Sequence, residues 1–340
     1  MWEKTIRMLL MGSMFAVLLS ACSSEQGRQG PPSAKMLKPI SLQLQWVTQA
    51  QFAGYYVALD KGWYKEEGLD LTIKPGGPDL VPVDLVAAGA SDFGTTLLAD
   101  LAVAIQKGTP VISIGQIQQA NGLLLVAKKN SGISGPKDFI GKKVGFWLGS
   151  WEAQFNALLA KEGIAEEKVN IVPQGWSMEP FLRGDLEVAS AMIYNEYHVL
   201  LERGVKPEDL NIIDYADFGL GFPGDVLFSS LKQRKKDPDL CVGILRASLK
   251  GWQYATKHPE EAAEIVLKYD KTGVQTLEHQ LAMMKEITKL VKVPERQLGE
   301  TNEVTVEQMV DLLVRYKILD TPVQPSDIYT EVFLNSFSLK

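Results

Sequence analysis

Short apolar runs of strand length alternate with amphipathic helical stretches from residue 41 onward. The apolar runs predict strands over 41–46, 69–74, 91–95 and 111–116, and the stretches between them predict helices over 52–61, 83–88 and 97–107. Strands that alternate with helices are typical of crossover units. This part of the chain therefore predicts a mainly parallel sheet flanked by helices.

A second series of the same kind begins near Gly122. It predicts strands over 123–127, 143–147, 169–172 and 189–193, and helices over 152–162 and 196–203. A strand at 226–229 precedes helical stretches at 239–257, 260–269, 274–291 and 305–316, with prolines at the joins. We therefore predict an α/β fold of two lobes, residues 40–122 plus 225–340 and residues 123–224, with a ligand cleft between them.

The first forty residues have a different pattern. Lys4 and Arg7 precede an apolar run over 8–19, which would reach roughly 18 Å as a helix and is too short for a hydrocarbon core of roughly 30 Å. We expect a signal peptide over 1–21. The sequence LSAC at 19–22 resembles the bacterial lipoprotein signal, in which the thiol of the cysteine, here Cys22, is acylated; the alternative is an ordinary secretory cleavage beside a chance cysteine.

Residues 22–39 are rich in Ser, Gly, Gln and Pro and show no hydrophobic period, so we expect a flexible tether there. The whole chain of 340 residues carries a formal net charge of −6, which gives no basic footprint for nucleic acid. Its 3 histidines and 2 cysteines are too few for a disulfide framework or a zinc cluster. We expect neither a metal nor a cofactor.

Several stretches form a recognisable set: LQLQW at 42–46, QFAGYYVA at 51–58, KGWYKEEGL at 61–69, GASDFG at 89–94, PKD at 136–138, GKKVG at 141–145 and ASAMIYNEY at 189–197. Together they resemble type 2 periplasmic binding proteins, the solute-binding proteins of ABC importers. More narrowly, they resemble the branch related to thiamine-pyrimidine synthase. The resemblance implies the two-lobed type 2 fold and a lipid-anchored monomer on the extracytoplasmic face of the cell membrane, with ABC permease and ATPase subunits as partners.

Within this branch the resemblance implies a planar nitrogen heterocycle as ligand, either riboflavin or a thiamine pyrimidine precursor such as formylaminopyrimidine. Hydantoins and sulfonates remain alternatives. Enzyme members carry a histidine after the first tryptophan and a cysteine cluster, whereas residues 46–51 hold no histidine and only Cys241 accompanies Cys22. These departures argue against an enzyme, and the absent histidine also favours riboflavin over the pyrimidine precursor.

Two aromatic residues follow strands of different lobes and are candidates to stack on a planar ring. Trp46 follows the first strand, and Tyr194 follows the strand at 189–193. Stacking on an aromatic side chain contributes roughly 1–3 kcal/mol per ring. Asn195 and Glu196 would read the polar edge of the ligand. The alternatives are that Trp46 is core, and that Asn195 caps a helix with Glu196 in its first turn.

Further candidates lie near the same strand ends. Trp147, Ser150 and Trp151 bridge a strand and a helix N-terminus, where backbone N–H groups favour anions or carbonyl oxygens, although packing tryptophans beside a helix cap would explain them equally well. One of Tyr55 and Tyr56 should face the cleft, and we select Tyr56. The amides of Gln118 and Asn121 lie at the first crossover between lobes. The remaining isolated residues are expected to be structural, namely His198, His258, His279 and Trp252.

Overall fold

The computed structural model describes residues 36–148, 151–291 and 296–338, and the chain from Leu37 onward makes up one structural unit. Cys22 and Ser150 lie outside the described residues, as does the segment expected to be a signal peptide. Among the helices of the described ranges, none combines the length and apolar character needed to cross a membrane.

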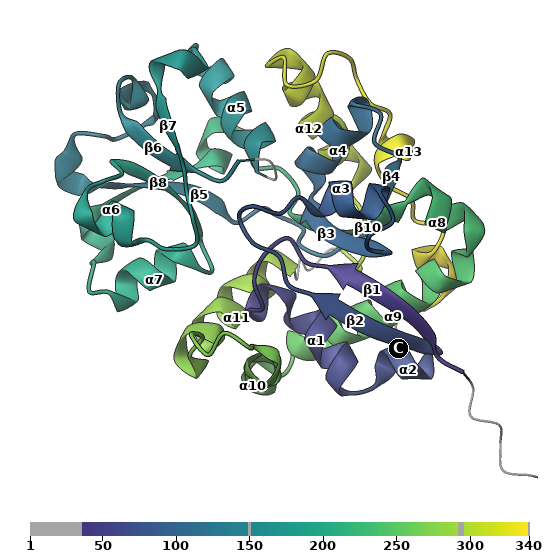
Figure 1. The fold of residues 1–340 in the computed structure, drawn as a ribbon. Helices are drawn as coiled ribbons and strands as arrows, with labels where there is room; N and C mark the ends of the chain where they lie inside the picture. The colour runs from purple at the N-terminus through teal and green to yellow at the C-terminus, as the bar shows by residue number, and fades with distance from the viewer. Residues whose placement is uncertain (1–35, 149–150, 292–295, 339–340) are drawn as a thin grey trace, which may run out of the picture. The chain divides into compact units, whose positions relative to one another are not determined.

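The first sheet has five strands in the order β2-β1-β3-β10-β4 (Figure 1). Their bounds are β1 Lys38–Gln43, β2 Leu69–Lys74, β3 Phe93–Leu97, β4 Val111–Gln116 and β10 Asp225–Ser230. Strands β2, β1 and β3 are parallel, whereas β10 is antiparallel to both β3 and β4. Strand β1 begins at Lys38, inside the segment that the sequence predicts as tether.

The second sheet has the order β7-β6-β8-β5-β9. Its strands are β5 Leu123–Lys128, β6 Lys143–Phe146, β7 Asn170–Pro173, β8 Val188–Met192 and β9 Leu210–Asp214. Strand β5 is antiparallel to β8 and β9, and β6 is parallel to β7 and β8. We call each sheet with the helices that follow its strands a lobe, the first and the second.

The prediction of an α/β fold is confirmed, and each sheet is mainly parallel, because four of its five strands run in one direction. One reversed strand in each, β10 in the first sheet and β5 in the second, makes both sheets mixed, which the sequence analysis does not predict. The reason is the way the chain passes between them. Strand β4 ends at Gln116, and β10 begins beside that end, since Val226 pairs with Gln116. Strand β5 likewise begins where β8 ends, with Leu123 opposite Met192. A strand that enters from the other sheet starts where its neighbours finish, so it runs against them.

Helices of the first lobe come from both halves of the chain. They are α1 Ala53–Asp60, α2 Trp63–Glu66, α3 Pro82–Ala87, α4 Leu98–Gln106, α8 Leu231–Lys236, α9 Pro238–Ala255, α10 Pro259–Tyr269, α11 Leu277–Val291, α12 Glu303–Arg315 and α13 Pro325–Ile328. The second lobe contains α5 Glu152–Lys161, α6 Glu179–Arg183 and α7 Glu196–Glu202. Short 3-10 turns include η1 Ala50–Phe52, η3 Pro136–Phe139 and η6 Tyr215–Phe218.

Helices α1 and α9 approach each other unusually closely because each has a glycine at the contact. A Cβ on Gly251 would lie 1.9 Å from the carbonyl oxygen of Gly54, and one on Gly54 would lie 2.2 Å from the Trp252 ring. Trp252 is buried and meets Tyr55 edge to face. The prediction that Trp252 belongs to the core is confirmed, and this contact fixes the helix that follows the loop carrying Trp46.

Two neighbouring segments connect the lobes, residues 117–122 and 215–224. They are hydrogen-bonded to each other: the Gln118 N–H donates to the Asp225 carbonyl at 3.1 Å, and the Asn121 N–H donates to the Phe222 carbonyl at 3.0 Å. Gly224 is required here, because a Cβ would come within 2.6 Å of the Ala120 carbonyl oxygen. The paired crossovers hold the strand ends of both sheets around one region.

Candidate functional site

Three tryptophans from the two lobes meet at the strand ends. Trp46 follows β1, Trp147 follows β6, and Trp151 immediately precedes α5. The Trp46 ring lies 5.5 Å from the Trp147 ring and 5.4 Å from the Trp151 ring, and Trp147 and Trp151 are 5.7 Å apart. Trp46 meets both neighbours edge to face, a geometry that contributes about 0.5–1.5 kcal/mol per pair beyond area burial. All three are buried.

A small cavity, which we call the tryptophan pocket, lies beside this cluster. It is lined by Trp46, Gln51, Trp147, Trp151, Met192, Tyr194, Asn195 and Glu196. Its free volume is about 10 Å³, whereas ligand pockets usually measure about 300–1,000 Å³. The rings themselves occupy the region, so a planar ligand would have to displace at least one of them.

The tryptophan pocket combines a buried carboxylate with an indole N–H that lacks a partner among the described residues. Glu196 is 2% exposed, and burial raises the pKa of its carboxyl group from the usual 4.5 to about 7. Its Oε2 accepts a hydrogen bond from the Met192 N–H at 2.9 Å, and its Oε1 accepts one from Asn195 Nδ2 at 2.6 Å. The buried Trp151 Nε1–H has no hydrogen-bond partner among the residues that the structure describes.

Asn195 stands at the N-cap position of α7 but does not cap it with its side chain. Its amide instead donates to Glu196, and its Oδ1 lies 2.9 Å from Nε2 of His279 on α11. The helix-cap interpretation of Asn195 is therefore wrong. The expectation that His279 is a plain structural residue does not anticipate this contact between a first-lobe helix and the pocket wall of the second lobe.

A second buried carboxylate, Asp225, lies at the start of β10 where the crossovers meet. Gln45 Nε2 donates to its Oδ1 at 2.8 Å, and Gln118 Nε2 lies 3.3 Å from its Oδ2. Burial raises the pKa of Asp225 from the usual 3.8 to about 7. Sequence reasoning missed this residue, although a lone carboxylate opening an apolar strand was a signal that could have revealed it.

The predicted site residues divide into two groups. The structure brings together Trp46, Trp147, Trp151, Tyr194, Asn195 and Glu196 around the tryptophan pocket. Gln51 and Met192 also line it, although the sequence analysis does not select them. Met192 ends an apolar strand and Gln51 lies in a short turn, so neither carries a chemical signal by residue type.

The second group comprises Tyr56, Gln118 and Asn121, which are absent from the described lining of the tryptophan pocket. The Tyr56 hydroxyl is bonded to the Thr48 hydroxyl at 2.8 Å, and its ring lies 5.3 Å from that of Tyr269. Asn121 donates to Gln154 at 2.6 Å and accepts from the Leu123 N–H at 2.9 Å. These partners give Tyr56 and Asn121 structural roles.

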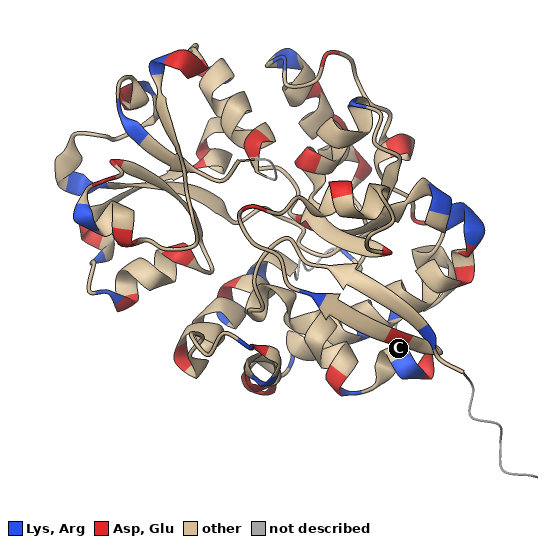
Figure 2. Ribbon diagram, in the orientation of Figure 1, with Lys and Arg blue, Asp and Glu red and all other residues tan. Residues whose placement is uncertain are grey.

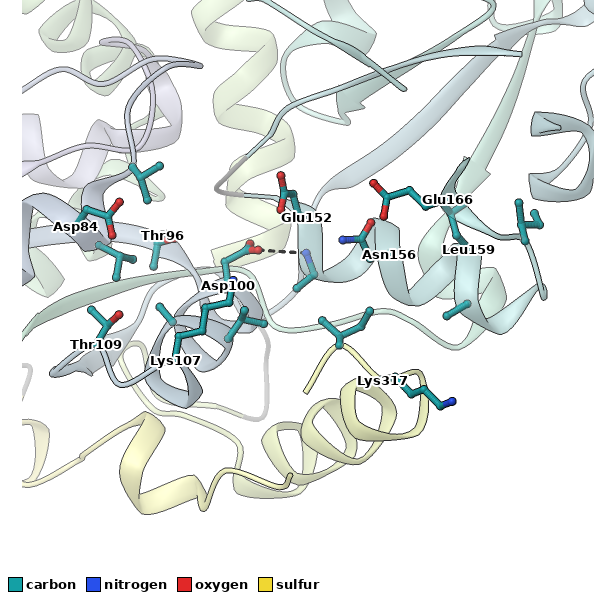
Figure 3. Close-up of a pocket in the computed structure, with 18 residues that line it drawn as sticks. Asp84, Thr96, Asp100, Lys107, Thr109, Glu152, Asn156, Leu159, Glu166 and Lys317 are labelled. Atoms are coloured by element: carbon teal, nitrogen blue, oxygen red, sulfur yellow. Dashed lines mark hydrogen bonds between the residues drawn. The ribbon is translucent and has the colours of Figure 1, made fainter. Parts of the chain in front are cut away.

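Two wider hollows flank the tryptophan pocket. An outer groove of about 230 Å³ shares Trp46 and Asn195 with it and includes His279 and Trp176; Trp176 is 65% exposed. A larger cavity of about 630 Å³ lies between α4 and α5 (Figure 3). There Asp100 Oδ1 accepts a hydrogen bond from the Ala153 N–H at 3.2 Å, and burial raises the pKa of Asp100 well above its usual range.

The tryptophan pocket and the α4–α5 cavity differ in the charged residues that line them. Figure 2 shows lysines, arginines and carboxylates spread over the helices of both lobes. The described lining of the tryptophan pocket contains one carboxylate and no lysine or arginine. The α4–α5 cavity carries four carboxylates and two lysines, from Asp84, Asp100, Glu152, Glu166, Lys107 and Lys317. Within the described ranges, no group of three or more His, Cys, Asp or Glu side chains is arranged to hold a metal ion.

Proteins of known sequence and structure resemble this chain over most of its length. It is 24% identical over 307 residues to a formylaminopyrimidine-binding protein of Halalkalibacterium halodurans, covering 87% of this chain and 91% of that protein. It is 29% identical over 301 residues to a 4-amino-5-hydroxymethyl-2-methylpyrimidine phosphate synthase of Legionella pneumophila, covering 87% and 92%. It is 27% identical over 285 residues to the riboflavin-binding protein RibY of Chloroflexus aurantiacus, covering 78% of each.

Among solved structures, the periplasmic aliphatic sulphonate binding protein SsuA of Escherichia coli superposes with a TM-score of 0.64 at 15% identity, covering 89% of this chain and 96% of that one. That likeness shows the fold, which is the two-lobed fold of the periplasmic binding proteins. Residues 49–262 match the family model described as NMT1/THI5 like, which spans more than half of the chain. The protein therefore belongs to the NMT1/THI5-like family.

Proposed function

We propose that this protein is a solute-binding protein of an ABC importer, which captures a planar nitrogen heterocycle in the tryptophan pocket and delivers it to the membrane permease. The observation that carries the proposal is the pocket itself. Trp46 from the first lobe and Tyr194 from the second lie on one cavity beside a buried carboxylate. Aromatic faces from both lobes suit a flat ring. A site built from both lobes is complete only when the lobes come together.

The polar groups indicate what kind of ring fits. Glu196 accepts hydrogen bonds while ionised, and the unpartnered Trp151 Nε1–H can donate one. A ring edge with an N–H beside a carbonyl would satisfy both groups. An anionic sulfonate would instead meet a carboxylate, with no cationic side chain in the described lining. A sulfonate beside an ionised carboxylate is unfavourable in a buried site, so the pocket argues against sulfonates.

Riboflavin is the ligand that we favour. Its isoalloxazine ring has the N–H and carbonyl edge and a broad aromatic face, and three tryptophans with one tyrosine offer a wall wider than one pyrimidine needs. The absence of histidine over residues 46–51 supports the same choice. A thiamine pyrimidine precursor is the second candidate, favoured by the small free space of about 10 Å³, because a single ring requires less rearrangement of the tryptophans.

The relative from Legionella pneumophila is named as a synthase, so the alternative to a binding protein is an enzyme. Family enzymes consume a histidine that follows the first tryptophan, and this chain has glutamines there. Cys241 is buried in α9, remote in sequence from the pocket residues. Incubation with pyridoxal phosphate and iron, followed by intact mass measurement, separates the two functions. We expect the mass of the protein to stay unchanged. A loss of mass at one of its histidines would instead establish enzyme activity.

Binding is tested directly by titrating riboflavin with the purified protein. Flavin stacked on indole should lose fluorescence, so quenching reports the dissociation constant. The Trp46→Ala variant should bind roughly 5- to 150-fold more weakly, which is the equivalent of about 1–3 kcal/mol of stacking. Trp63→Ala is the matched control, because Trp63 packs on Tyr254 and not in the pocket. A parallel titration with an aminopyrimidine identifies the second candidate. Failure of both ligands to bind would refute the proposal.

A further inference from the structure

Helix α11 contacts both walls of the tryptophan pocket through two consecutive residues. Gln280 Oε1 accepts a hydrogen bond from the Ala50 N–H at 2.6 Å, in the turn that carries Gln51. His279 Nε2 lies 2.9 Å from Asn195 Oδ1 at the start of α7. The first contact holds a segment of the first lobe and the second holds the second lobe. One helix therefore sets the distance between the two walls.

Both ring nitrogens of His279 face oxygen atoms. Nδ1 lies 2.8 Å from Glu202 Oε1, and Nε2 faces Asn195 Oδ1. The orientation of the Asn195 amide follows from its other end, where Nδ2 donates to Glu196 Oε1 at 2.6 Å. A carboxylate oxygen and an amide oxygen are both acceptors. Only the imidazolium form has two N–H donors to satisfy them.

His279, Asn195 and Glu196 have a second arrangement in which every hydrogen bond among them is also satisfied. It differs from the first by the transfer of one proton from His279 to Glu196. If Glu196 is protonated, it can donate to Asn195 Oδ1 once the amide has turned over, and Asn195 Nδ2 then donates to Nε2 of a neutral His279. Burial, which raises the pKa of Glu196 to about 7, brings this form within reach near neutral pH. Asn195 thus connects the protonation of Glu196 to that of His279.

We propose that His279 is a positioning residue for ligand capture, whose imidazolium links α11 to α7 and holds Asn195 and Glu196 ready to accept a ligand N–H. A ligand N–H that donates to Glu196 selects the ionised carboxylate, which in turn selects the imidazolium and strengthens the contact between lobes. This step rests on the proposed function, since it requires a ligand with an N–H group. Capture of such a ligand then moves the shared proton from Glu196 to His279, and at a pH high enough for both groups to have lost it, capture takes up one proton at His279.

Other charged groups around His279 come mainly from α7. His198 and Glu202 lie on that helix, and Arg203 follows it and is bonded to Glu179 of α6. Glu286 of α11 lies near His198. The turn η1 and the described loop before it contain no titratable side chain. Helix α10 directs its Tyr269 hydroxyl to Asp60. Glu202 is the carboxylate bonded to the ring, so it is the partner to change.

The first experiment needs no ligand. Nitrogen-15 NMR of the histidine side chains between pH 5 and 9 distinguishes imidazolium from either neutral tautomer, and the His279→Gln spectrum assigns the signal. We expect the signals of a doubly protonated ring, and Glu202→Gln should reduce the share of that form at a given pH, because the amide removes a negative partner of the ring. A ring with one unprotonated nitrogen throughout this range would overturn the proposal, whatever the protein binds.

The second experiment measures binding against pH. Riboflavin, or the aminopyrimidine if that is the ligand, should bind wild type with little pH dependence while Glu196 and His279 share one proton. Above the pH at which the pair loses that proton, binding should weaken by up to about tenfold per pH unit for one linked proton. His279→Gln should bind weakly and should not weaken further as pH rises, because Glu196 must then lose its proton to solvent before it can accept the ligand N–H. His198→Gln, which changes a histidine two residues beyond Glu196, should behave as wild type. Equal pH profiles for wild type and His279→Gln would overturn the proposal while leaving the binding function intact.

Discussion

Replacing Asp225 with asparagine should stabilise the protein, and increasingly so as pH rises. The side chain is 5% exposed. Two glutamine amides are its described hydrogen-bond partners, and no lysine or arginine is paired with it among the described residues. Burial disfavours the charged form, so its pKa is raised from 3.8 to about 7. Asparagine has nearly the same shape and carries no charge, so it removes the penalty while preserving an acceptor for Gln45.

The magnitude follows from the two pKa values. Below pH 3.8 the carboxyl group is protonated in the folded and the unfolded chain, and the wild type has no penalty relative to the variant. As pH rises to about 7, the unfolded chain releases its proton before the folded one does, and folded stability falls. One pH unit is equivalent to about 1.4 kcal/mol, so the displacement of this pKa corresponds to about 4 kcal/mol in total.

The assay is urea unfolding of wild type and Asp225→Asn at intervals from pH 4 to 9. The difference in unfolding free energy should grow by about 1.4 kcal/mol per pH unit between about pH 4 and 7 and then level off. Other buried carboxylates, including Glu196, are present in both proteins and cancel in the difference. Parallel stability curves across this range would refute the reasoning, because they would show that Asp225 titrates alike in the folded and unfolded chains.

Three further outcomes are expected. Tyr194→Ala should weaken riboflavin binding by roughly 5- to 150-fold, as fluorescence titration would show, and unchanged affinity would remove Tyr194 from the site. Cys22→Ser should release the protein from the membrane to the soluble fraction on cell fractionation, since acyl chains contribute about 0.8 kcal/mol per buried CH₂; continued membrane association would exclude the lipid anchor. Gly251→Ala should lower the unfolding free energy by about 1–3 kcal/mol through overpacking against α1, whereas Gly77→Ala, with nothing within 4 Å of its Cβ, should not.

The secondary structure could be predicted from sequence because hydrophobic periodicity is a local property. The predicted strands at 69–74 and 111–116 coincide with β2 and β4, and the helix predicted over 152–162 matches α5 within one residue. Strand β9 was missed. It covers only Leu210–Asp214, where two isoleucines in succession break the alternation of apolar and polar residues, and it lies beside a turn rich in charged residues. Such a short and irregular run does not stand out as a strand. The reversed direction of β5 and β10 was not predicted, because it depends on which sheet the chain enters.

The residues around the tryptophan pocket were accessible to sequence reasoning only where a strand end placed them. Trp46 and Tyr194 follow strands of different lobes, and strand ends of an α/β sheet converge, so their meeting could be inferred. His279 could not be found in this way, because it lies 84 positions from Asn195, near the start of an amphipathic helical pattern.

The helical period predicts only that a residue such as His279 is buried. It does not say whether the ring nitrogens of a buried histidine face apolar side chains or two acceptors. That distinction decides between a structural histidine and a charged one. It depends on how α11 and α7 face each other, and no local pattern contains that information. Contacts between lobes are therefore where the structure adds most to the sequence, and they are also the contacts that ligand binding would change.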